Sequence, residues 1–363
     1  MKIGIDARPL SHELTGIGRY TLNVITELFK LDDKIEWYLY SDRPLLMSFD
    51  YPNVHIRVGK KGTPFTSTLF SQCLFPVWAV KDKLDTFWSP RHHLPLALVL
   101  HRRLHKVVTI HDIVWKRHPE TMSKFGLMLE KLLFTPSVII ADAIITVSKF
   151  TTNEIVNEIN QIENKIQTIS LKSFISDELK QQKYHPYINE EYILFVGTLE
   201  PRKNLNNLLI AFKKVQQEKP KVKLVIVGKD GWGDIRISDL VQSLGIEKSV
   251  VITGFVTDEE LLSLYQHCAI LAMPSLYEGF GLPALEALSM KKKVVVSKFT
   301  AIADIEGDNI FLTELDSNAI GHCINEALEA SPRLFADVDN NWSTIAERTL
   351  NLLQTEASRV SCQ

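Results

Sequence analysis

A glycine-rich stretch near the end of the chain carries two glutamates at a spacing that can serve one binding site. Glu278 opens the run Glu-Gly-Phe-Gly-Leu-Pro, and Glu286 follows it on the next predicted helix. An apolar strand over 269–273 leads into this stretch, and Pro283 suits the first turn of a helix, where its missing N–H costs nothing. The backbone amides of residues 279–282 are therefore predicted to point outward at a helix N-terminus, where they can receive a phosphate. Carboxylates beside such an anion site can accept hydrogen bonds from the hydroxyls of a sugar or a ribose.

A pair of cations in the same half of the chain favours a binding site over solvated surface charges for these glutamates. Arg202 and Lys203 follow an apolar strand over 192–196 and precede a helix over 205–215, which Asn204 is expected to cap. Two cations beside the positive end of a helix are unfavourable unless an anion joins them. An arginine offers a planar fork and a lysine a point charge, and both suit a pyrophosphate. We therefore expect this pair to bind a diphosphate.

The first half of the chain places a histidine and an acid at the end of a predicted strand. His111 and Asp112 follow the apolar run over 106–110. Open α/β sheets bind their ligands at the carboxyl ends of their strands. A lone histidine is more often structural, but this location favours a functional role.

Two glycines, Gly16 and Gly18, lie between a first strand over 2–6 and a helical pattern that begins near residue 22. Thr21 stands where a dinucleotide fingerprint has its third glycine, and no acidic residue ends the second strand, so a dehydrogenase is not favoured. Two interpretations remain: a glycine loop that lets the backbone approach a phosphate or a sugar, and a plain turn.

Short apolar runs that alternate with helical patterns divide the chain into two similar α/β halves. Such alternation is typical of a mostly parallel sheet with helices on both faces. The rhythm is lost over 175–190, which we interpret as a linker between a domain over 1–175 and a domain over 190–340, with a final amphipathic segment over 341–363. Two such units are expected to face each other across a cleft. The expected strands cover 2–6, 36–40, 54–58, 86–88, 106–110, 138–147, 192–196, 224–227, 250–252, 269–273 and 294–297.

The composition is that of a globular protein, because 45% of the 363 residues are hydrophobic and 23% are charged. The net charge of −2 is unevenly distributed: the first 175 residues hold 22 Lys and Arg against 17 Asp and Glu. A basic half can meet anionic lipid, nucleic acid or phosphorylated substrates, or it can be an uneven solvated surface. The four cysteines have no C-x-x-C spacing. Their scatter argues against a zinc site and a disulfide framework, and suits a reducing cytoplasm.

Membrane contact, if any, is expected to be peripheral. No apolar run reaches the roughly 20 residues that cross a bilayer, and Met1-Lys2 leads directly into a strand without a signal peptide. The apolar run over 69–80, the basic run over 101–106 and the pair Lys60-Lys61 are consistent with a surface that faces a membrane or a lipid acceptor. The apolar run also suits an ordinary core helix.

One string has the form of a metal-binding D-x-D motif. Asp337-Val-Asp339 precedes the last helical segment. At that position a capping role is the simpler interpretation. We therefore expect no metal site there.

Taken together, these motifs resemble the retaining glycosyltransferases of family 4, which have the GT-B fold. The most specific part is Glu278 and Glu286 within Glu-Gly-Phe-Gly-Leu-Pro-Ala-Leu-Glu-Ala, together with Arg202-Lys203. In detail the chain is similar to bacterial mannosyl- and related transferases that build O-antigen or exopolysaccharide. The other segments that carry the resemblance are 16–20, 109–112, 147–148, 200–204, 228–232 and the final helix from Trp342, which in this family crosses back to the first domain.

The resemblance implies a role for each of these positions. Arg202 and Lys203 would bind the diphosphate of a nucleotide-sugar. Glu286 would bind the ribose and Glu278 the donor sugar, and His111 would approach the sugar from the first domain. The implied catalytic residues are thus His111, Arg202, Lys203 and Glu278. The implied donor-binding residues are Gly16, Gly18, Asp112, Phe255, Val256, Gly279, Phe280, Gly281, Leu282 and Glu286.

The family also implies a reaction and a setting. A hexose, with mannose from GDP-mannose as the first choice, would move to a glycan or a lipid-linked oligosaccharide with retention of configuration. No metal or other cofactor and no nucleic acid would take part. The protein would be cytoplasmic, with possible contact at the inner face of the membrane. A glycoside phosphorylase or hydrolase of similar architecture, and a silent nucleotide-sugar-binding subunit, are the alternatives. Thr198 stands where some relatives have an arginine, which leaves the donor open.

Overall fold

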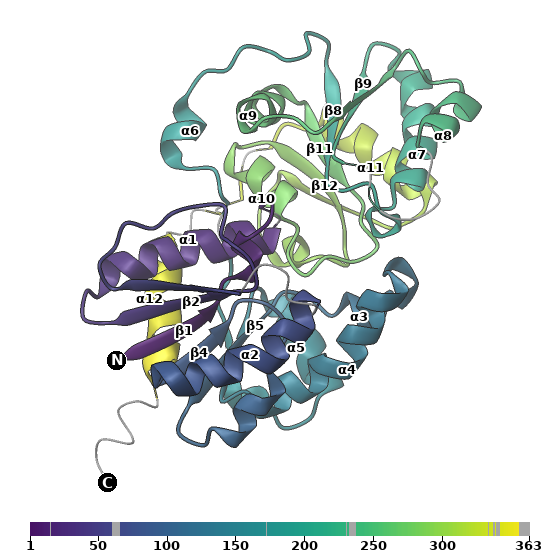
Figure 1. Cartoon of the computed structure of the whole chain (residues 1–363). Helices are drawn as coiled ribbons and strands as arrows, with labels where there is room; N and C mark the ends of the chain where they lie inside the picture. The colour runs from purple at the N-terminus through teal and green to yellow at the C-terminus, as the bar shows by residue number, and fades with distance from the viewer. Residues whose placement is uncertain are drawn as a thin grey trace. The chain divides into compact units, whose positions relative to one another are not determined.

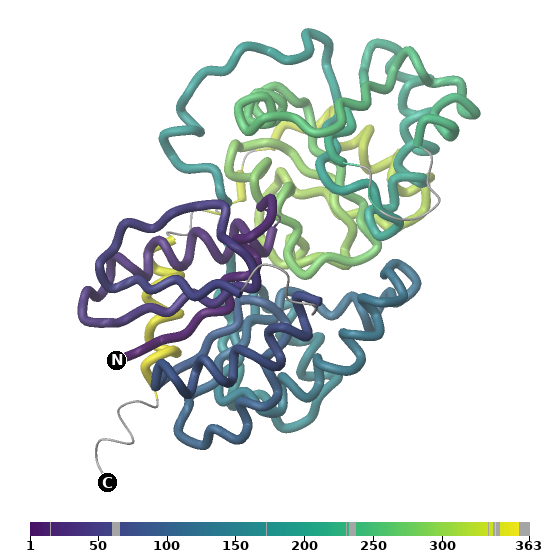
Figure 2. The backbone as a smooth tube through the Cα atoms, in the orientation of Figure 1, coloured from purple at the N-terminus to yellow at the C-terminus, as the bar shows by residue number. Residues whose placement is uncertain are grey.

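The computed structural model describes residues 1–14, 16–59, 66–171, 173–229, 231, 237–332, 334–336, 338 and 342–355. Within these ranges the chain divides into two units, each of which is described by itself. Unit 1 comprises residues 1–113 and 124–171 and the last helix, and unit 2 comprises residues 114–123 and 172–339, apart from the gaps just given. Figure 1 labels the helices and strands of both units, and Figure 2 follows the backbone through them.

The sheet of unit 1 is parallel and has seven strands in the order β3-β2-β1-β4-β5-β6-β7. Its central strands β4 and β5 are buried at every position, as expected for a parallel sheet that is covered on both faces. The strands are β1 (Lys2–Asp6), β2 (Glu36–Ser41), β3 (Val54–Val58), β4 (Thr86–Ser89), β5 (His105–Ile110), β6 (Ala143–Thr146) and β7 (Ile166–Thr168).

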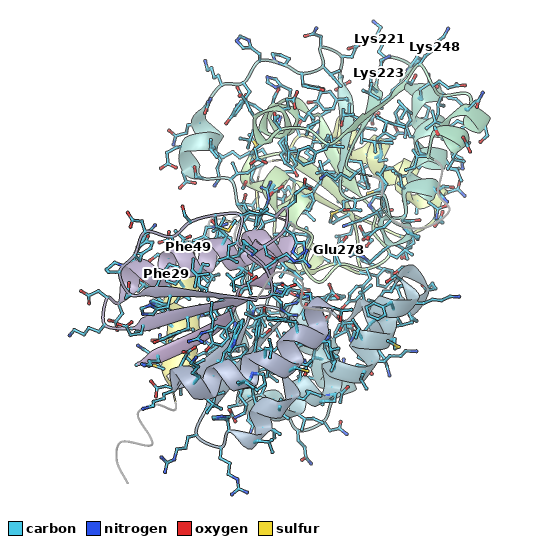
Figure 3. All side chains as sticks on the ribbon, in the orientation of Figure 1. Phe29, Phe49, Lys221, Lys223, Lys248 and Glu278 are labelled. Atoms are coloured by element: carbon cyan, nitrogen blue, oxygen red, sulfur yellow. The ribbon has the colours of Figure 1, made fainter. Side chains whose placement is uncertain are left out.

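The helices of unit 1 include the last helix of the chain, which returns to this unit as the family resemblance predicts. That helix packs against α1, β4 and β5, and the Thr86 hydroxyl donates a hydrogen bond of 2.8 Å to the carbonyl of Leu353. Phe29 of α1 packs edge-on against Phe49 with ring centroids 5.6 Å apart (Figure 3). The helices are α1 (Gly16–Leu31), α2 (Ser67–Asp82), α4 (Lys124–Ile140), α5 (Lys149–Glu158) and α12 (Trp342–Gln354), with the 3-10 helices η1 (Arg8–Leu10), η2 (Leu96–Leu100) and η4 (Glu163–Lys165).

The sheet of unit 2 is also parallel and has six strands in the order β10-β9-β8-β11-β12-β13. The strands are β8 (Tyr192–Val196), β9 (Lys223–Val227), β10 (Val250–Gly254), β11 (Ile270–Met273), β12 (Lys293–Ser297) and β13 (Ile310–Thr313). The helices are α3 (Val114–Arg117), α6 (Asp177–Gln181), α7 (Leu205–Glu218), α8 (Ile237–Leu244), α9 (Asp258–His267), α10 (Leu282–Ser289) and α11 (Ser317–Glu329). The 3-10 helices are η3 (Pro119–Thr121), η5 (Pro201–Lys203) and η6 (Ala301–Asp304).

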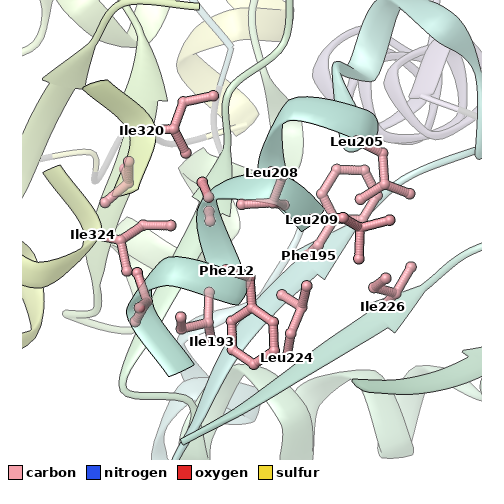
Figure 4. Close-up of a cluster of buried hydrophobic side chains, with 14 of the residues drawn as sticks. Ile193, Phe195, Leu205, Leu208, Leu209, Phe212, Leu224, Ile226, Ile320 and Ile324 are labelled. Carbon is pink, nitrogen blue, oxygen red and sulfur yellow. The ribbon is translucent and has the colours of Figure 1, made fainter. Parts of the chain in front are cut away.

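The core of unit 2 forms where the apolar stripe of α7 meets the sheet (Figure 4). Leu205, Leu208, Leu209 and Phe212 recur at helical spacing, and at most 1% of the surface of each is exposed. They pack with side chains of β8, β9 and α11 in one cluster, which includes Ile193, Phe195, Leu224, Ile226, Ile320 and Ile324. Burial of each such side chain stabilises the fold by about 1.5–3 kcal/mol. This core fixes the ends of β8 and α7, between which the cationic pair lies.

The strand order of each unit creates a point where consecutive connections leave in opposite directions. In unit 2 this point lies between β8 and β11, because β8 continues to β9 on one side and β11 continues to β12 on the other. In unit 1 the corresponding point lies between β1 and β4. Doubly wound sheets bind ligands at the carboxyl edge of such switch points. A ligand site in unit 2 is therefore expected at the loops that follow β8 and β11.

Two of the predicted segments differ in type from the structure. Residues 138–140, predicted as the start of a strand over 138–147, are the last turn of α4, and β6 begins only at Ala143. Gly16 and Gly18 lie in the first turn of α1 and not in a loop. The segment over 175–190, interpreted as a linker, contains the short helix α6.

Candidate functional site

Two loops meet at the switch point of unit 2 and are joined through their backbones. The loop after β8 contains Arg202, whose carbonyl accepts a hydrogen bond of 2.8 Å from the N–H of Leu276 in the loop after β11. In return, Nη1 of Arg202 donates to the carbonyl of Tyr277 at 3.0 Å. Gly228, which follows β9, lies so close to Gly197 that a Cβ on it would stand 1.9 Å from the Gly197 carbonyl oxygen. The loops are thus positioned by close backbone contacts that exclude a side chain at Gly228.

The side chains of these loops form one cluster of four charges. Glu278 accepts from Lys203 at 2.5 Å through Oε1 and from Arg202 at 2.7 Å through Oε2. Arg202 also pairs with Glu200 at 2.6 Å. Glu278 and Lys203 are each 8% exposed, and Glu278 is labelled in Figure 3. The two cations and two carboxylates balance, so that the cluster is neutral. Glu200 and Glu278 therefore supply the negative charge that the cationic pair requires.

The ionisation of Glu278 limits the chemistry that it can perform. Burial alone would raise the pKa of its carboxyl group, but Arg202 and Lys203 outweigh burial and lower the pKa to about 2. Glu278 is therefore an anion at neutral pH. A carboxylate in this state accepts hydrogen bonds but holds no proton to donate, which argues against a general acid.

The stretch after Glu278 ends in a helix N-terminus, as predicted. Gly281 caps α10 with φ 92°, and no side chain caps the helix. A Cβ at Gly281 would meet Cε of Met273 at 2.8 Å, so both its backbone conformation and its surroundings require glycine. Among the described residues, no protein acceptor bonds the N–H groups of Phe280, Gly281 or Leu282. Free N–H groups at this end of a helix can receive an anion.

The second glutamate of the motif lies inside α10 and is held by a tyrosine. Glu286 is 7% exposed, and its Oε2 accepts a hydrogen bond of 2.7 Å from the hydroxyl of Tyr265 on α9. Tyr265 itself is 1% exposed. This contact fixes the carboxylate of Glu286 from the protein side.

Phe255 and Val256, which were expected to bind the donor, differ in their exposure. Phe255 follows β10 and is 73% exposed, with Nζ of Lys229 at 4.6 Å from its ring centroid. Val256 is 7% exposed. Phe255 therefore offers a side chain to a ligand, whereas Val256 offers mainly its backbone.

In unit 1, His111 lies at the carboxyl end of β5 with its ring anchored on one side. Its Nε2 lies 2.9 Å from the carbonyl of Pro90, which can only accept, so that the proton is on Nε2. Tyr20 packs edge-on against the ring at 5.0 Å. Burial, with the nearby His92, lowers the pKa of His111 to about 4. The imidazole is therefore neutral at physiological pH, and its Nδ1 can accept a hydrogen bond. Asp112, the next residue, is half-buried.

Of the two glycines for which a loop was predicted, Gly18 has a packing role in α1. A Cβ at Gly18 would lie 3.0 Å from the carbonyl oxygen of Pro9 and 3.1 Å from Leu14. Gly16 is the first residue of the helix. Gly18 therefore lets the helix approach the segment after β1.

Several residues of the site were not predicted as such from the sequence. Glu200 lies two positions before Arg202, and this spacing is the one local signal for their pairing. Tyr265 carries no local signal, because its partner Glu286 lies on another helix. Asn204 does precede α7, but its side chain does not cap the helix and instead donates to the carbonyl of Leu315 at 2.9 Å.

Neither a metal site nor a membrane span is found in the described part of the chain. There, no group of three or more His, Cys, Asp or Glu residues is suited to hold a metal ion. Asp337 and Asp339 of the D-x-D string lie outside the described residues. No described helix is both long and apolar enough to cross a membrane.

Comparison with known proteins adds a sequence match to this geometry. The family model of the glycosyl transferases group 1 matches residues 176–349. The O-antigen chain mannosyltransferase B of Escherichia coli is 30% identical over 372 residues, which cover 95% of this chain and 93% of that protein.

Solved structures show the same architecture. The sucrose-phosphate synthase of Thermosynechococcus elongatus superposes with a TM-score of 0.73 at 18% identity, over 99% of this chain and 100% of that one. WaaG, a glycosyltransferase involved in lipopolysaccharide biosynthesis, superposes with a TM-score of 0.66 at 13% identity, over 99% of this chain and 98% of that one. The two α/β units and the returning last helix are those of the GT-B fold, as predicted.

Proposed function

The chain belongs to the group 1 glycosyl transferases, and on that premise we propose that it moves mannose from GDP-mannose to a glycan or lipid-linked oligosaccharide, as part of surface polysaccharide synthesis. The observation that supports a donor site is the neutral cluster that Arg202 and Lys203 form with Glu200 and Glu278 at the switch point of unit 2. The choice of mannose follows the name of the E. coli relative that matches almost the whole chain.

The cluster suits a donor because its two cations can exchange one anionic partner for another. Entry of a diphosphate would let Arg202 and Lys203 leave Glu278 for phosphate oxygens, which bind a guanidinium and an ammonium well. The free N–H groups at the start of α10 would add to this anion site. Glu278, ionised at neutral pH, would then accept hydrogen bonds from the hydroxyls of the donor sugar. Glu286, held by Tyr265, would accept from the ribose.

The reaction then follows from where negative charge develops. As the bond between the anomeric carbon and the phosphate oxygen breaks, the nucleoside diphosphate becomes more negative, and Arg202 and Lys203 stabilise it. The acceptor oxygen forms a bond to the same face of the anomeric carbon, and its proton passes to the departing phosphate oxygen. Configuration is retained, and neither glutamate is a covalent nucleophile. His111, neutral and with Nδ1 able to accept a hydrogen bond, would contact the donor sugar.

A panel of nucleotide-sugars with a lipid-linked or oligosaccharide acceptor tests this proposal, with the anomeric configuration of the product read by NMR. We expect turnover with GDP-mannose and an α-linked product. Sugar release without nucleotide would indicate a phosphorylase or hydrolase, and nucleotide binding without turnover would indicate a silent subunit. Wild-type transfer by both Lys203→Ala and Glu278→Ala would overturn the site assignment.

We further propose that unit 1 touches the inner face of the cytoplasmic membrane, where a lipid-linked acceptor would reside. The helices α2 and α4 both pack against η2, and together they expose large apolar side chains: Leu69, Val77, Val80, Val99, Leu100, Phe125, Met128, Leu132 and Ile139. Exposed cations lie on and beside the same elements: Lys81, Lys83, Arg102, Arg103, Lys124 and Lys131. The basic run over 101–106 contributes only in part, because Lys106 is buried and pairs with Asp142 at 2.6 Å. Apolar chains among cations suit an anionic lipid surface.

Co-sedimentation with phosphatidylglycerol and phosphatidylcholine vesicles tests the membrane proposal. We expect binding to the anionic vesicles and its loss in Lys124→Glu/Lys131→Glu. The matched control is Lys221→Glu/Lys248→Glu, which reverses two exposed charges of unit 2 (Figure 3). Equal binding by both variants, or binding to phosphatidylcholine alone, would contradict the charge-based contact.

A further inference from the structure

The loop after β4 holds His111 at two points, its backbone and its ring. Nε2 of His92 lies 3.2 Å from the backbone nitrogen of His111, whose N–H can only donate. The carbonyl of Pro90, two positions earlier in the same loop, accepts the ring Nε2–H of His111 at 2.9 Å. A shift of this loop would therefore move both the main chain and the imidazole of His111.

Donor and acceptor logic fixes the tautomer of His92. Because Nε2 of His92 accepts a hydrogen bond, its ring proton must be on Nδ1. That nitrogen lies 3.5 Å from Oε1 of Glu130 on α4, while Oε2 of the same carboxylate lies 3.0 Å from Nε2 of His93. The side chains of His92 and His93 are 11% and 10% exposed, and that of Glu130 is 16% exposed. A largely buried carboxylate therefore anchors the loop through both of its oxygens.

We infer that Glu130 and His92 are positioning residues for His111. Glu130 keeps the proton of His92 on Nδ1, and His92 then accepts the backbone N–H of His111. The Pro90 carbonyl keeps the proton of His111 on Nε2. The chain of contacts leaves Nδ1 of His111 as the ring atom that can accept a hydrogen bond from a donor-sugar hydroxyl. In this last step the inference rests on the proposed function.

The arrangement makes the support of His111 sensitive to acid. The charged groups that face His92 are Glu130 from α4, Asp112 after β5 and Arg91 in its own loop. The neutral but titratable His111 also faces it, and the ring of Phe134 packs edge-on against it at 5.9 Å. Burial lowers the pKa of His92, but Glu130 outweighs burial and raises it. A proton on Nε2 of His92 would face the N–H of His111 and break their hydrogen bond. The contact is therefore lost as the pH falls through the pKa of His92.

Nitrogen-15 NMR of histidine-labelled protein tests the contacts without any turnover, with signals assigned by single substitutions. We expect His92 as the Nδ1–H tautomer and His111 as the Nε2–H tautomer at pH 7.5. Glu130→Gln should lower the pH at which His92 takes up its second proton, because it removes the charge that favours the imidazolium. His55→Gln, which removes an exposed histidine of β3, is the control and should leave both signals unchanged. A proton on Nε2 of His92, or an unchanged midpoint in Glu130→Gln, would overturn the inference.

Kinetics then separate a positioning role from a merely structural one. His92→Gln can still accept the N–H of His111 through its amide oxygen but cannot titrate, so we expect it to keep kcat within about threefold and to lose the acid limb of the pH profile. His92→Leu offers no acceptor, and we expect its kcat to fall at least tenfold with the donor KM less affected, while circular dichroism shows it folded. Wild-type kcat and pH profile in both variants would refute the positioning role. Absence of turnover in the wild-type chain would refute the proposed function instead, and the NMR result would stand.

Discussion

Substitution of Glu278 by glutamine isolates the balance of charge in the donor site. The change keeps the size of the side chain but leaves Arg202 and Lys203 with one carboxylate, Glu200, between them. The pKa of Glu278 is lowered from 4.5 to about 2, which corresponds to roughly 3–4 kcal/mol of favourable interaction. Breaking a buried ion pair typically costs about 3–5 kcal/mol. Because Arg202 keeps Glu200 as a partner, we expect the free energy of unfolding to fall by a smaller amount, about 2–3 kcal/mol.

Thermal unfolding with and without GDP measures this effect. For a unit of this size the expected loss corresponds to a Tm lower by about 5–10 °C. GDP supplies phosphate oxygens to the same cations, so we expect it to raise the Tm of Glu278→Gln more than that of the wild type. Transfer should fall by about 10- to 100-fold, because one or two hydrogen bonds to a charged group are lost. The control Glu314→Gln removes a half-exposed carboxylate that pairs with Lys298, and it should change the stability by less than about 0.5 kcal/mol.

Two results would contradict a neutralising role for Glu278. A Glu278→Gln chain that unfolds at the wild-type temperature would mean that the carboxylate does not neutralise the cations. An equal Tm increase by GDP in both chains would mean that nucleotide and Glu278 do not compete for the same partners.

Three further predictions follow from the same unit. Tyr265→Phe removes one hydrogen bond to Glu286, so the KM for the nucleotide-sugar should rise about fivefold to tenfold, the equivalent of one hydrogen bond, with kcat nearly unchanged in steady-state kinetics. Gly228→Ala places a Cβ 1.9 Å from the Gly197 carbonyl, so denaturant titration should show a loss above about 3 kcal/mol, as expected when backbone must shift. The stability that Glu278 contributes is complete above pH 4.5 and is lost as the pH falls toward 2. The difference in unfolding free energy between wild type and Glu278→Gln should therefore shrink to near zero over that range, and an unchanged difference at pH 2 would contradict the assignment.

Strands with a strong apolar pattern were well predicted from the sequence, but the apolar end of the helix α4 was mistaken for the start of a strand. The expected strand over 192–196 and helix over 205–215 match β8 and α7 closely. The prediction of a strand that begins at Val138 was wrong, because α4 is apolar on nearly every side. Phe134 and Val138 are buried, while Leu132 and Ile139 are exposed. Without a polar face, the sequence of such a helix shows no helical period in its hydrophobic residues. Its apolar end therefore cannot be distinguished from a strand by pattern alone.

For the candidate site, the sequence predicted the residues themselves but not the partners with which they pair. The sequence motifs located Arg202, Lys203, Glu278 and Glu286 on the loops and helix where they lie. Their pairing was not predicted, because Lys203 and Glu278 are 75 positions apart and meet only through the strand order of the sheet. The expectation of cations awaiting an anion therefore missed the carboxylate that neutralises them.

Calorimetric titration of GDP into the wild-type chain and Lys203→Ala tests whether the donor diphosphate binds the cations beside Glu278. We expect saturable binding of GDP to the wild type and a loss of at least about tenfold in affinity in the variant, the equivalent of one charge-assisted hydrogen bond. Equal affinity of GDP for both chains would contradict it.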